Sequence, residues 1–105
     1  MGQGMSFKEQ WPARAFTIRD GDSEPRVVAV QGRARWALEH LMRTGSKGCT
    51  PIEQPGPRWS AYVFKLKKAG VCIETIHESH DGPFPGHHAR YVLRSSVTPG
   101  REAAE

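Results

Sequence analysis

The segment 58–69 restricts the fold of this chain more than any other part of the sequence. Its apolar side chains recur at three- and four-residue spacings, which predicts an α-helix whose buried face is formed by Trp59, Tyr62, Val63, Leu66 and Ala69. Gly70 follows at the position where a glycine in the left-handed conformation commonly ends a helix. The far side of this helix carries Ala61, Lys65 and Lys68, flanked by Arg58, Ser60 and Phe64. We therefore expect a helix with one apolar face packed on a core and one basic face outside.

The residues before this helix predict two others. In segment 31–44, apolar residues again recur at helical spacings, and Gly45 stands in the place of a C-terminal cap. Thr50-Pro51-Ile52-Glu53 has the form of a helix start, with Thr50 as N-cap and Glu53 three residues later to complete a capping box. Pro55-Gly56-Pro57 prevents this second helix from continuing beyond about one turn.

Alternating and β-branched residues predict strands at both ends of the chain. The segments 71–79 and 89–94 alternate in the manner of strands, and the Gly/Pro-rich residues between them can only form a connection, so we expect a hairpin with a long tip. The short runs 16–19 and 26–30 flank a turn-rich hexapeptide and indicate a second hairpin.

The order of helix, short helix, basic helix and hairpin is typical of the winged helix-turn-helix, an α+β fold with three helices and a C-terminal β-hairpin wing. A chain of 105 residues makes about one domain, which excludes a two-domain enzyme. We expect the winged helix domain to span residues 31–95. An N-terminal extension (residues 1–30), which can form a strand or hairpin, precedes it, and a flexible tail (residues 96–105) follows.

Positive charge is concentrated in the middle of the chain. Residues 31–70 contain eight basic and two acidic side chains, whereas the whole chain has a net charge of +4. A basic block of this kind is expected of a surface that binds a polyanion, although a basic helix face can also be simply solvated.

The apolar runs of the sequence are far shorter than the ~20 residues of a membrane helix. We expect no membrane span and, without a visible secretory signal, a cytoplasmic protein.

Three short segments resemble a family of small bacterial and phage winged helix-turn-helix domains. They are Lys65 to Gly70 (KLKKAG), Ile73 to Thr75 (IET) and Ala89 to Leu93 (ARYVL), and the likeness covers roughly residues 31–95. The resemblance implies the winged helix fold and, less directly, DNA binding in the regulation of transcription. The Pro55-Gly56-Pro57 break departs from the usual pattern because it shortens the second helix and stiffens the turn after it.

We therefore expect the protein to bind double-stranded DNA, with the helix 58–69 in the major groove and the loop 81–88 as the wing on the neighbouring phosphates. Arg58 is the best candidate to read guanine, because a guanidinium matches the two acceptors on the major-groove edge of that base. Lys67 falls nearer the core and is a weaker candidate. The predicted DNA-binding residues are Arg58, Ser60, Ala61, Lys65, Lys68, His87, His88 and Arg90.

The main alternative is a winged helix that serves as a protein-interaction module. In that case Phe64 and Trp36 would anchor a partner, and the basic face would be incidental. Trp36 falls opposite the apolar stripe of its own helix, and we expect the N-terminal segment to cover it. A homodimer also stays open, because the N-terminal strands could offer an edge to a second copy.

Metal binding and catalysis have less support. His77, His80, His87 and His88 invite a metal site, but two histidines three residues apart in a strand point to opposite faces, and no CxxC or HExxH pattern is present. Cys49 and Cys72 are expected to be reduced thiols rather than a disulfide, and Cys49 has no identifiable base that would make it a nucleophile. We expect no metal, no cofactor and no enzymatic activity.

Overall fold

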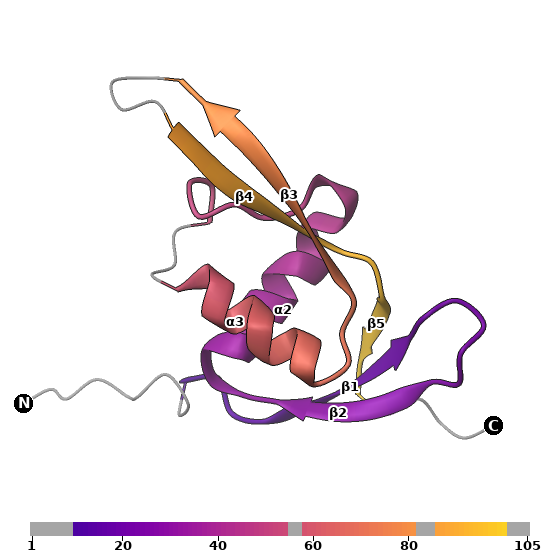
Figure 1. The fold of residues 1–105 in the computed structure, drawn as a ribbon. Helices are drawn as coiled ribbons and strands as arrows, with labels where there is room; N and C mark the ends of the chain where they lie inside the picture. The colour runs from indigo at the N-terminus through magenta and orange to yellow at the C-terminus, as the bar shows by residue number, and fades with distance from the viewer. Residues whose placement is uncertain (1–9, 55–57, 82–85, 101–105) are drawn as a thin grey trace, which may run out of the picture.

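The computed structural model describes residues 10–54, 58–81 and 86–100, and Figure 1 shows how their helices and strands are arranged. Two helices cross in the middle of the molecule. A pair of long strands extends from one side of them, and a sheet of shorter strands lies at the other side. In chain order, the elements are the strands β1 (Arg14–Arg19) and β2 (Arg26–Val30), the helix α2 (Gly32–Thr44), the 3₁₀ helix η1 (Gly45–Lys47), the helix α3 (Trp59–Lys68), and the strands β3 (Ile73–His80), β4 (Gly86–Leu93) and β5 (Ser96–Pro99).

The N-terminal segment forms the expected hairpin, and its partner is the other end of the chain. Strands β1 and β2 pair antiparallel, and β5 pairs with the free edge of β1, giving the order β2-β1-β5. Thr17, in the middle of the central strand, is buried and donates a hydrogen bond to the carbonyl of Gly100 at 2.8 Å. Residues 96–99, expected in a flexible tail, thus form a strand, because β1 offers them a row of unpaired backbone groups. Residues 101–105 lie outside the described residues.

Strands β3 and β4 form a separate two-stranded antiparallel sheet, with a register that runs from Ile73 opposite Leu93 to His80 opposite Gly86. The strands predicted at 71–79 and 89–94 are therefore present. However, β4 begins earlier than predicted, so His87 and His88 belong to a strand and not to a loop. The tip at 82–85 lies outside the described residues.

Both long helices end at glycines as the sequence indicates. Gly45 has a φ of 57° and donates its N–H to the carbonyl of Leu41. Gly70 has a φ of 104°; its N–H bonds the carbonyl of Lys67, and the N–H of Val71 bonds that of Leu66. This pair of hydrogen bonds is the Schellman arrangement, which satisfies carbonyls that the helix end leaves unpaired.

The predicted short second helix is reduced to a turn over residues 51–54. Thr50 caps this turn as predicted, since its Oγ1 accepts a hydrogen bond from the N–H of Glu53 at 3.0 Å. The return bond of the capping box comes from Gln54 instead of Glu53: Gln54 Oε1 accepts the N–H of Thr50 at 2.9 Å. Among the described residues there are thus two α-helices, not the three expected, and neither is long and apolar enough to cross a membrane.

The core lies between α2, α3 and the strands. Its buried members include Phe16 and Ile18 of β1, Leu38 and Leu41 of α2, Trp59, Tyr62, Val63 and Leu66 of α3, and Tyr91 of β4. Trp36 is partly buried against α3, with its ring 5.3 Å from that of Trp59 and 6.1 Å from that of Tyr62. These ring contacts come from α3, and residues 1–9 of the N-terminal segment, which we expected to cover Trp36, lie outside the described residues.

Candidate nucleic-acid interface

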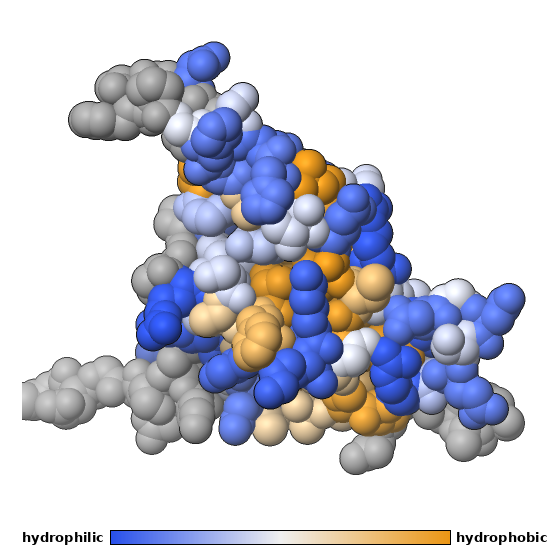
Figure 2. Space-filling view, viewed as in Figure 1, coloured by the Kyte–Doolittle hydropathy of each residue, from blue (hydrophilic) through white to orange (hydrophobic). Residues whose placement is uncertain are grey.

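Helix α3 turns its apolar face inward and its basic face outward. Trp59, Tyr62, Val63 and Leu66 are each at most 5% exposed, whereas Ser60, Phe64, Lys65, Lys67 and Lys68 are exposed. The helix contains no acidic residue, and the positive charge of its three lysines is therefore not balanced within the element. Figure 2 shows strongly hydrophilic side chains beside hydrophobic ones on the face of the molecule that carries α3. The outer face of α3, formed by these five exposed residues, therefore suits a polyanion partner.

The sequence-predicted residues of this region lie on the outer face or directly beside it. Arg58 is exposed and occupies the N-cap position, one residue before the helix begins. Ser60, Lys65 and Lys68 are exposed, while Ala61 is half-buried. The structure thus brings together five of the eight predicted DNA-binding residues on one side of the helix and at its start.

Lys67 differs from its prediction. We expected it nearer the core, yet its side chain is exposed. The reason is that the buried stripe of α3 is narrow: at about 100° per residue it ends at Val63 on this side, and Lys67 lies beyond Val63. Lys67 therefore adds a further cation to the outer face.

A groove of about 830 Å³ runs between α3 and the junction of β2 with α2. Arg58, Ala61 and Lys65 line it from α3, and Gln31 and Arg33 line it from the start of α2. The first turn of α2 contains no acidic residue, so the positive end of that helix dipole is not neutralised by a side chain of its own. Three cationic side chains and a helix start therefore border the same groove.

Two contacts fix how α3 sits on the rest of the molecule. At its start, the indole Nε1 of Trp59 donates a hydrogen bond to the carbonyl of Gln54 at 2.6 Å, which ties the helix to the preceding turn. At its end, the guanidinium of Arg26 on β2 donates to the carbonyl of Gly70 and pairs with Asp20 at 2.8 Å. A cation at a helix C-terminus also interacts favourably with the helix dipole. The orientation of the basic face is therefore held from both ends.

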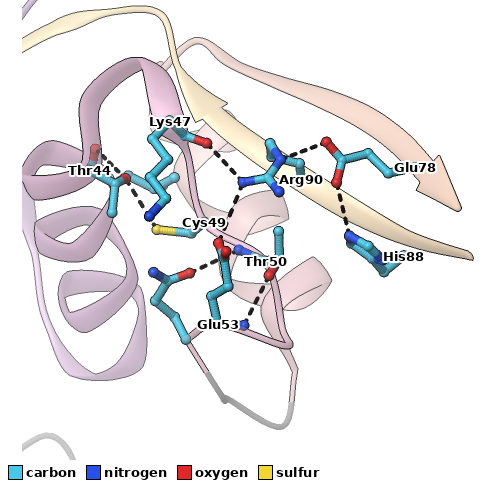
Figure 3. A network of polar contacts seen from close by, with 10 residues as sticks. Thr44, Lys47, Cys49, Thr50, Glu53, Glu78, His88 and Arg90 are labelled. Carbon is cyan, nitrogen blue, oxygen red and sulfur yellow. Dashed lines mark hydrogen bonds and ion pairs between the residues drawn. The ribbon is translucent and has the colours of Figure 1, made fainter. Parts of the chain in front are cut away.

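The three predicted residues of β4 are arranged differently from those of α3. His87 is exposed, but Arg90 and His88 are held by a carboxylate on the partner strand. Arg90 Nε donates to Glu78 Oε2 at 2.6 Å, and His88 Nε2 lies 2.9 Å from Glu78 Oε1 (Figure 3). Arg90 also donates to the carbonyl of Lys47 at 3.0 Å and lies 3.5 Å from a carboxylate oxygen of Glu53. Arg90 thus links β3, η1 and the turn after Thr50 within the molecule.

The same network lowers the pKa of Glu78. The hydrogen bond from Arg90 is the main cause, and the hydrogen bond with His88 acts in the same direction, while desolvation opposes them. The pKa of Arg90 is raised in turn, chiefly by its hydrogen bond to Glu78. The Glu78–Arg90 pair is therefore fully ionised at neutral pH.

We predict that this pair makes stability depend on pH in acid. Because the folded-state pKa of Glu78 lies below its ordinary value of 4.5, its contribution is present above about that pH and is lost as the pH falls below it. Glu78→Gln removes the contribution, so the Tm difference between wild type and variant should shrink as the pH is lowered from 7 to about 3. Thermal melts across this range, with Glu74→Gln at the exposed Arg94 pair as control, measure it. A difference that is constant with pH would contradict the assignment.

Sequence reasoning missed Glu78 and the groove residues of α2. Glu78 could have been found from the strand register, because it stands directly opposite His88, which leaves Arg90 as its diagonal neighbour on the partner strand. Gln31 and Arg33 gave a weaker signal: they belong to the basic middle of the chain, but nothing local shows that the start of α2 faces α3.

No three His, Cys, Asp or Glu side chains of residues 10–54, 58–81 and 86–100 gather as a metal site would need.

Comparison with known families gives one match. The family model described as winged helix domain matches residues 27–103, a stretch that begins in β2 and extends past β5. A search of curated proteins and a search of solved structures each found no match. The family match covers both helices, the strand pair β3–β4 and the strand β5.

Proposed function

Since the chain belongs to the winged helix domain family, we propose that it binds double-stranded DNA and regulates transcription, with α3 as the helix that enters the major groove. The observation that carries the proposal is the outer face of α3. It presents three exposed lysines, the exposed Arg58 before them and no carboxylate. A helix of this kind meets phosphates through its cations and base edges through the smaller side chains Ser60 and Ala61.

In this proposal, the groove beside α3 receives part of the phosphate backbone. Arg58 and Lys65 line it from one side and Arg33 from the other, so a phosphate strand along it would meet cations from two helices. Phosphate contacts of this kind fix the position of a protein on the duplex but carry no sequence information. Arg58 also keeps its proposed role as a guanine reader, because it stands at the N-terminus of α3, the part of a recognition helix that contacts base edges.

Strands β3 and β4 act as the wing. The exposed His87 near the start of β4 is a candidate phosphate contact, whereas Arg90 and His88 support the wing through Glu78. Arg90 joins the strand pair to η1 and to the turn that precedes α3, so it sets the angle between wing and helix. We therefore assign Arg90 a positioning role.

The test is a titration of fluorescent duplex DNA with the full chain over a series of salt concentrations. The release of counterions from about four to six neutralised phosphates predicts that log affinity falls with log salt with a slope of about −4 to −5. Fluorescence anisotropy on a mixed-sequence duplex measures this slope. A flat or absent response would overturn the proposal.

In the competing role as a protein-interaction module, the two proposed anchors differ in exposure. Trp36 is partly buried against Trp59 and Tyr62, so only part of its ring faces outward. Phe64 is 62% exposed and remains available. The charged side chains around the Phe64 ring determine which kind of partner this ring can bind.

A further inference from the structure

Phe64 is an unusual residue for the outer face of α3. It is 62% exposed, more than Ile52 at 57% or Val27 at 40%, the other large hydrophobic side chains that are exposed in the described part of the chain. At about 100° per residue, Lys68, Phe64 and Ala61 lie closest to the direction opposite the buried stripe, and Ala61 has the smallest side chain of the three. A ligand that approaches α3 from outside therefore meets the ring of Phe64 early.

The surroundings of this ring are cationic. Lys68 holds its ammonium 5.5 Å from the ring centroid, in the arrangement of a cation–π contact. Lys65 is the next residue along the helix, and Lys67 lies one turn on; both are exposed. A surface that covers Phe64 must therefore combine dense negative charge with a small apolar feature within reach of the ring.

The major groove of DNA at an A·T pair meets this description. Phosphates border the groove, and the C5-methyl of thymine is the apolar group that its floor presents. Ser60 lies one turn before Phe64 on the same stripe, and the half-buried Ala61 lies beside it, so neither blocks the approach of a base edge to the ring.

We propose that Phe64 contacts thymine methyl groups in the major groove and so gives the protein a preference for A·T pairs at the position it reads. This inference rests on the proposed function, because it requires α3 to enter the groove. Phe64 is then a specificity residue, whereas the lysines around it bind phosphates without regard to sequence.

The experiment removes and restores the methyl group without changing the protein. Wild-type chain is titrated by fluorescence anisotropy with a duplex of alternating A and T, and with the same duplex carrying deoxyuridine in place of thymidine. One lost methyl contact should weaken binding about fourfold. A duplex of alternating G and C should gain affinity by a similar factor when 5-methylcytosine replaces cytosine, because that methyl projects into the same groove.

Two variants assign the effect to the ring. Phe64→Ala should bind the thymidine and deoxyuridine duplexes equally, at about the affinity of wild type for the deoxyuridine duplex. Ile52→Ala removes another exposed apolar side chain outside α3 and should keep the wild-type preference. Equal Tm values for the three proteins establish that each is folded.

The outcomes separate the two proposals. Salt-dependent binding of duplex DNA without a methyl preference, or with a preference that survives in Phe64→Ala, overturns the role of Phe64 and leaves the proposed function intact; the exposed ring would then suit an acidic protein partner. Absence of salt-dependent binding to every duplex overturns both.

Discussion

Replacing Arg58, Lys65 and Lys68 together by alanine should weaken duplex binding by about two to three orders of magnitude at about 0.1 M salt. Each phosphate that a cation neutralises contributes about 0.9 to the slope of log affinity against log salt, so loss of the phosphate contacts of Lys65 and Lys68 should flatten that slope by about 1.8, and loss of the guanine contact of Arg58 lowers the affinity further. All three side chains are exposed on the outer face or at the start of α3, so their removal should leave the core unchanged. Anisotropy titrations at several salt concentrations measure both quantities.

A variant with the same net charge provides the matched control. Arg43, Lys47 and Arg94 are exposed cations on α2, on η1 and directly after β4, and none belongs to α3. Their combined replacement by alanine lowers the net charge equally but should retain most of the wild-type salt slope. Equal losses in the two triple variants would mean that binding follows overall charge and not the face of α3.

The helices could be predicted from sequence because their signals are local. The apolar stripe of α3, Gly45 and Gly70 all act within a few residues, and they have the predicted roles, except that Ala69, expected on the buried face, is the exposed C-cap of α3. The turn after Thr50 was predicted in part. Its cap is correct, but Gln54 supplies the return hydrogen bond, and the carbonyl of Gln54 bonds the indole of Trp59. This last contact depends on where Trp59 packs, which lies outside any local pattern.

The third strand of the three-stranded sheet could not be predicted, because its pairing also depends on tertiary packing. Strand β1 pairs with β5 in a register that places Phe16 opposite Pro99, more than eighty residues away along the chain. The short segment 96–99 has a weak strand signal of its own, and it becomes a strand because β1 presents an unpaired edge. Pairing of this kind is decided by tertiary context.

In the candidate site, too, the features that follow from local patterns could be predicted and those that depend on strand pairing could not. Exposure of Arg58, Ser60, Lys65 and Lys68 follows from helix periodicity, which a sequence reveals. The engagement of Arg90 by Glu78 follows from cross-strand register, which the sequence alone left open at the long connection. Cationic side chains in strands are therefore less safely assigned to a ligand than those on the outside of a helix, because a carboxylate on the partner strand can pair with them.

Gly48→Ala should destabilise the protein by about 4 kcal/mol or more. Gly48 has a φ of 76° and a ψ of −178°, a conformation essentially restricted to glycine, and strain there costs about 1 to 3 kcal/mol. A Cβ would also lie 2.6 Å from the carbonyl oxygen of Tyr91 and 2.9 Å from Cγ2 of Val92. The expected Tm decrease is about 16 °C or more for a domain of this size.

The backbone cannot move away from this clash without further loss. The carbonyl of Tyr91 accepts the N–H of Cys49 at 2.8 Å, and the N–H of Tyr91 donates to the carbonyl of Cys49 at 2.8 Å. This bridge fastens the segment after α2 to β4, the strand that carries Arg90. Separation of the two would release both hydrogen bonds and the contact between Arg90 and Lys47.

Gly45→Ala measures the backbone strain alone, so its comparison with Gly48→Ala gives the part of the effect that comes from close approach. Gly45 also has a positive φ, at 57°, but a Cβ there would meet nothing within 4 Å. The substitution should therefore cost only the strain of the backbone conformation, about 1 to 3 kcal/mol. Thermal and urea unfolding of both variants give the comparison. If they lose similar stability, the approach of Gly48 to Tyr91 is not what requires glycine. If Gly48→Ala is much less stable, the close approach of Gly48 to the backbone of Tyr91 is what requires glycine, and the joint between α2 and β4 depends on it.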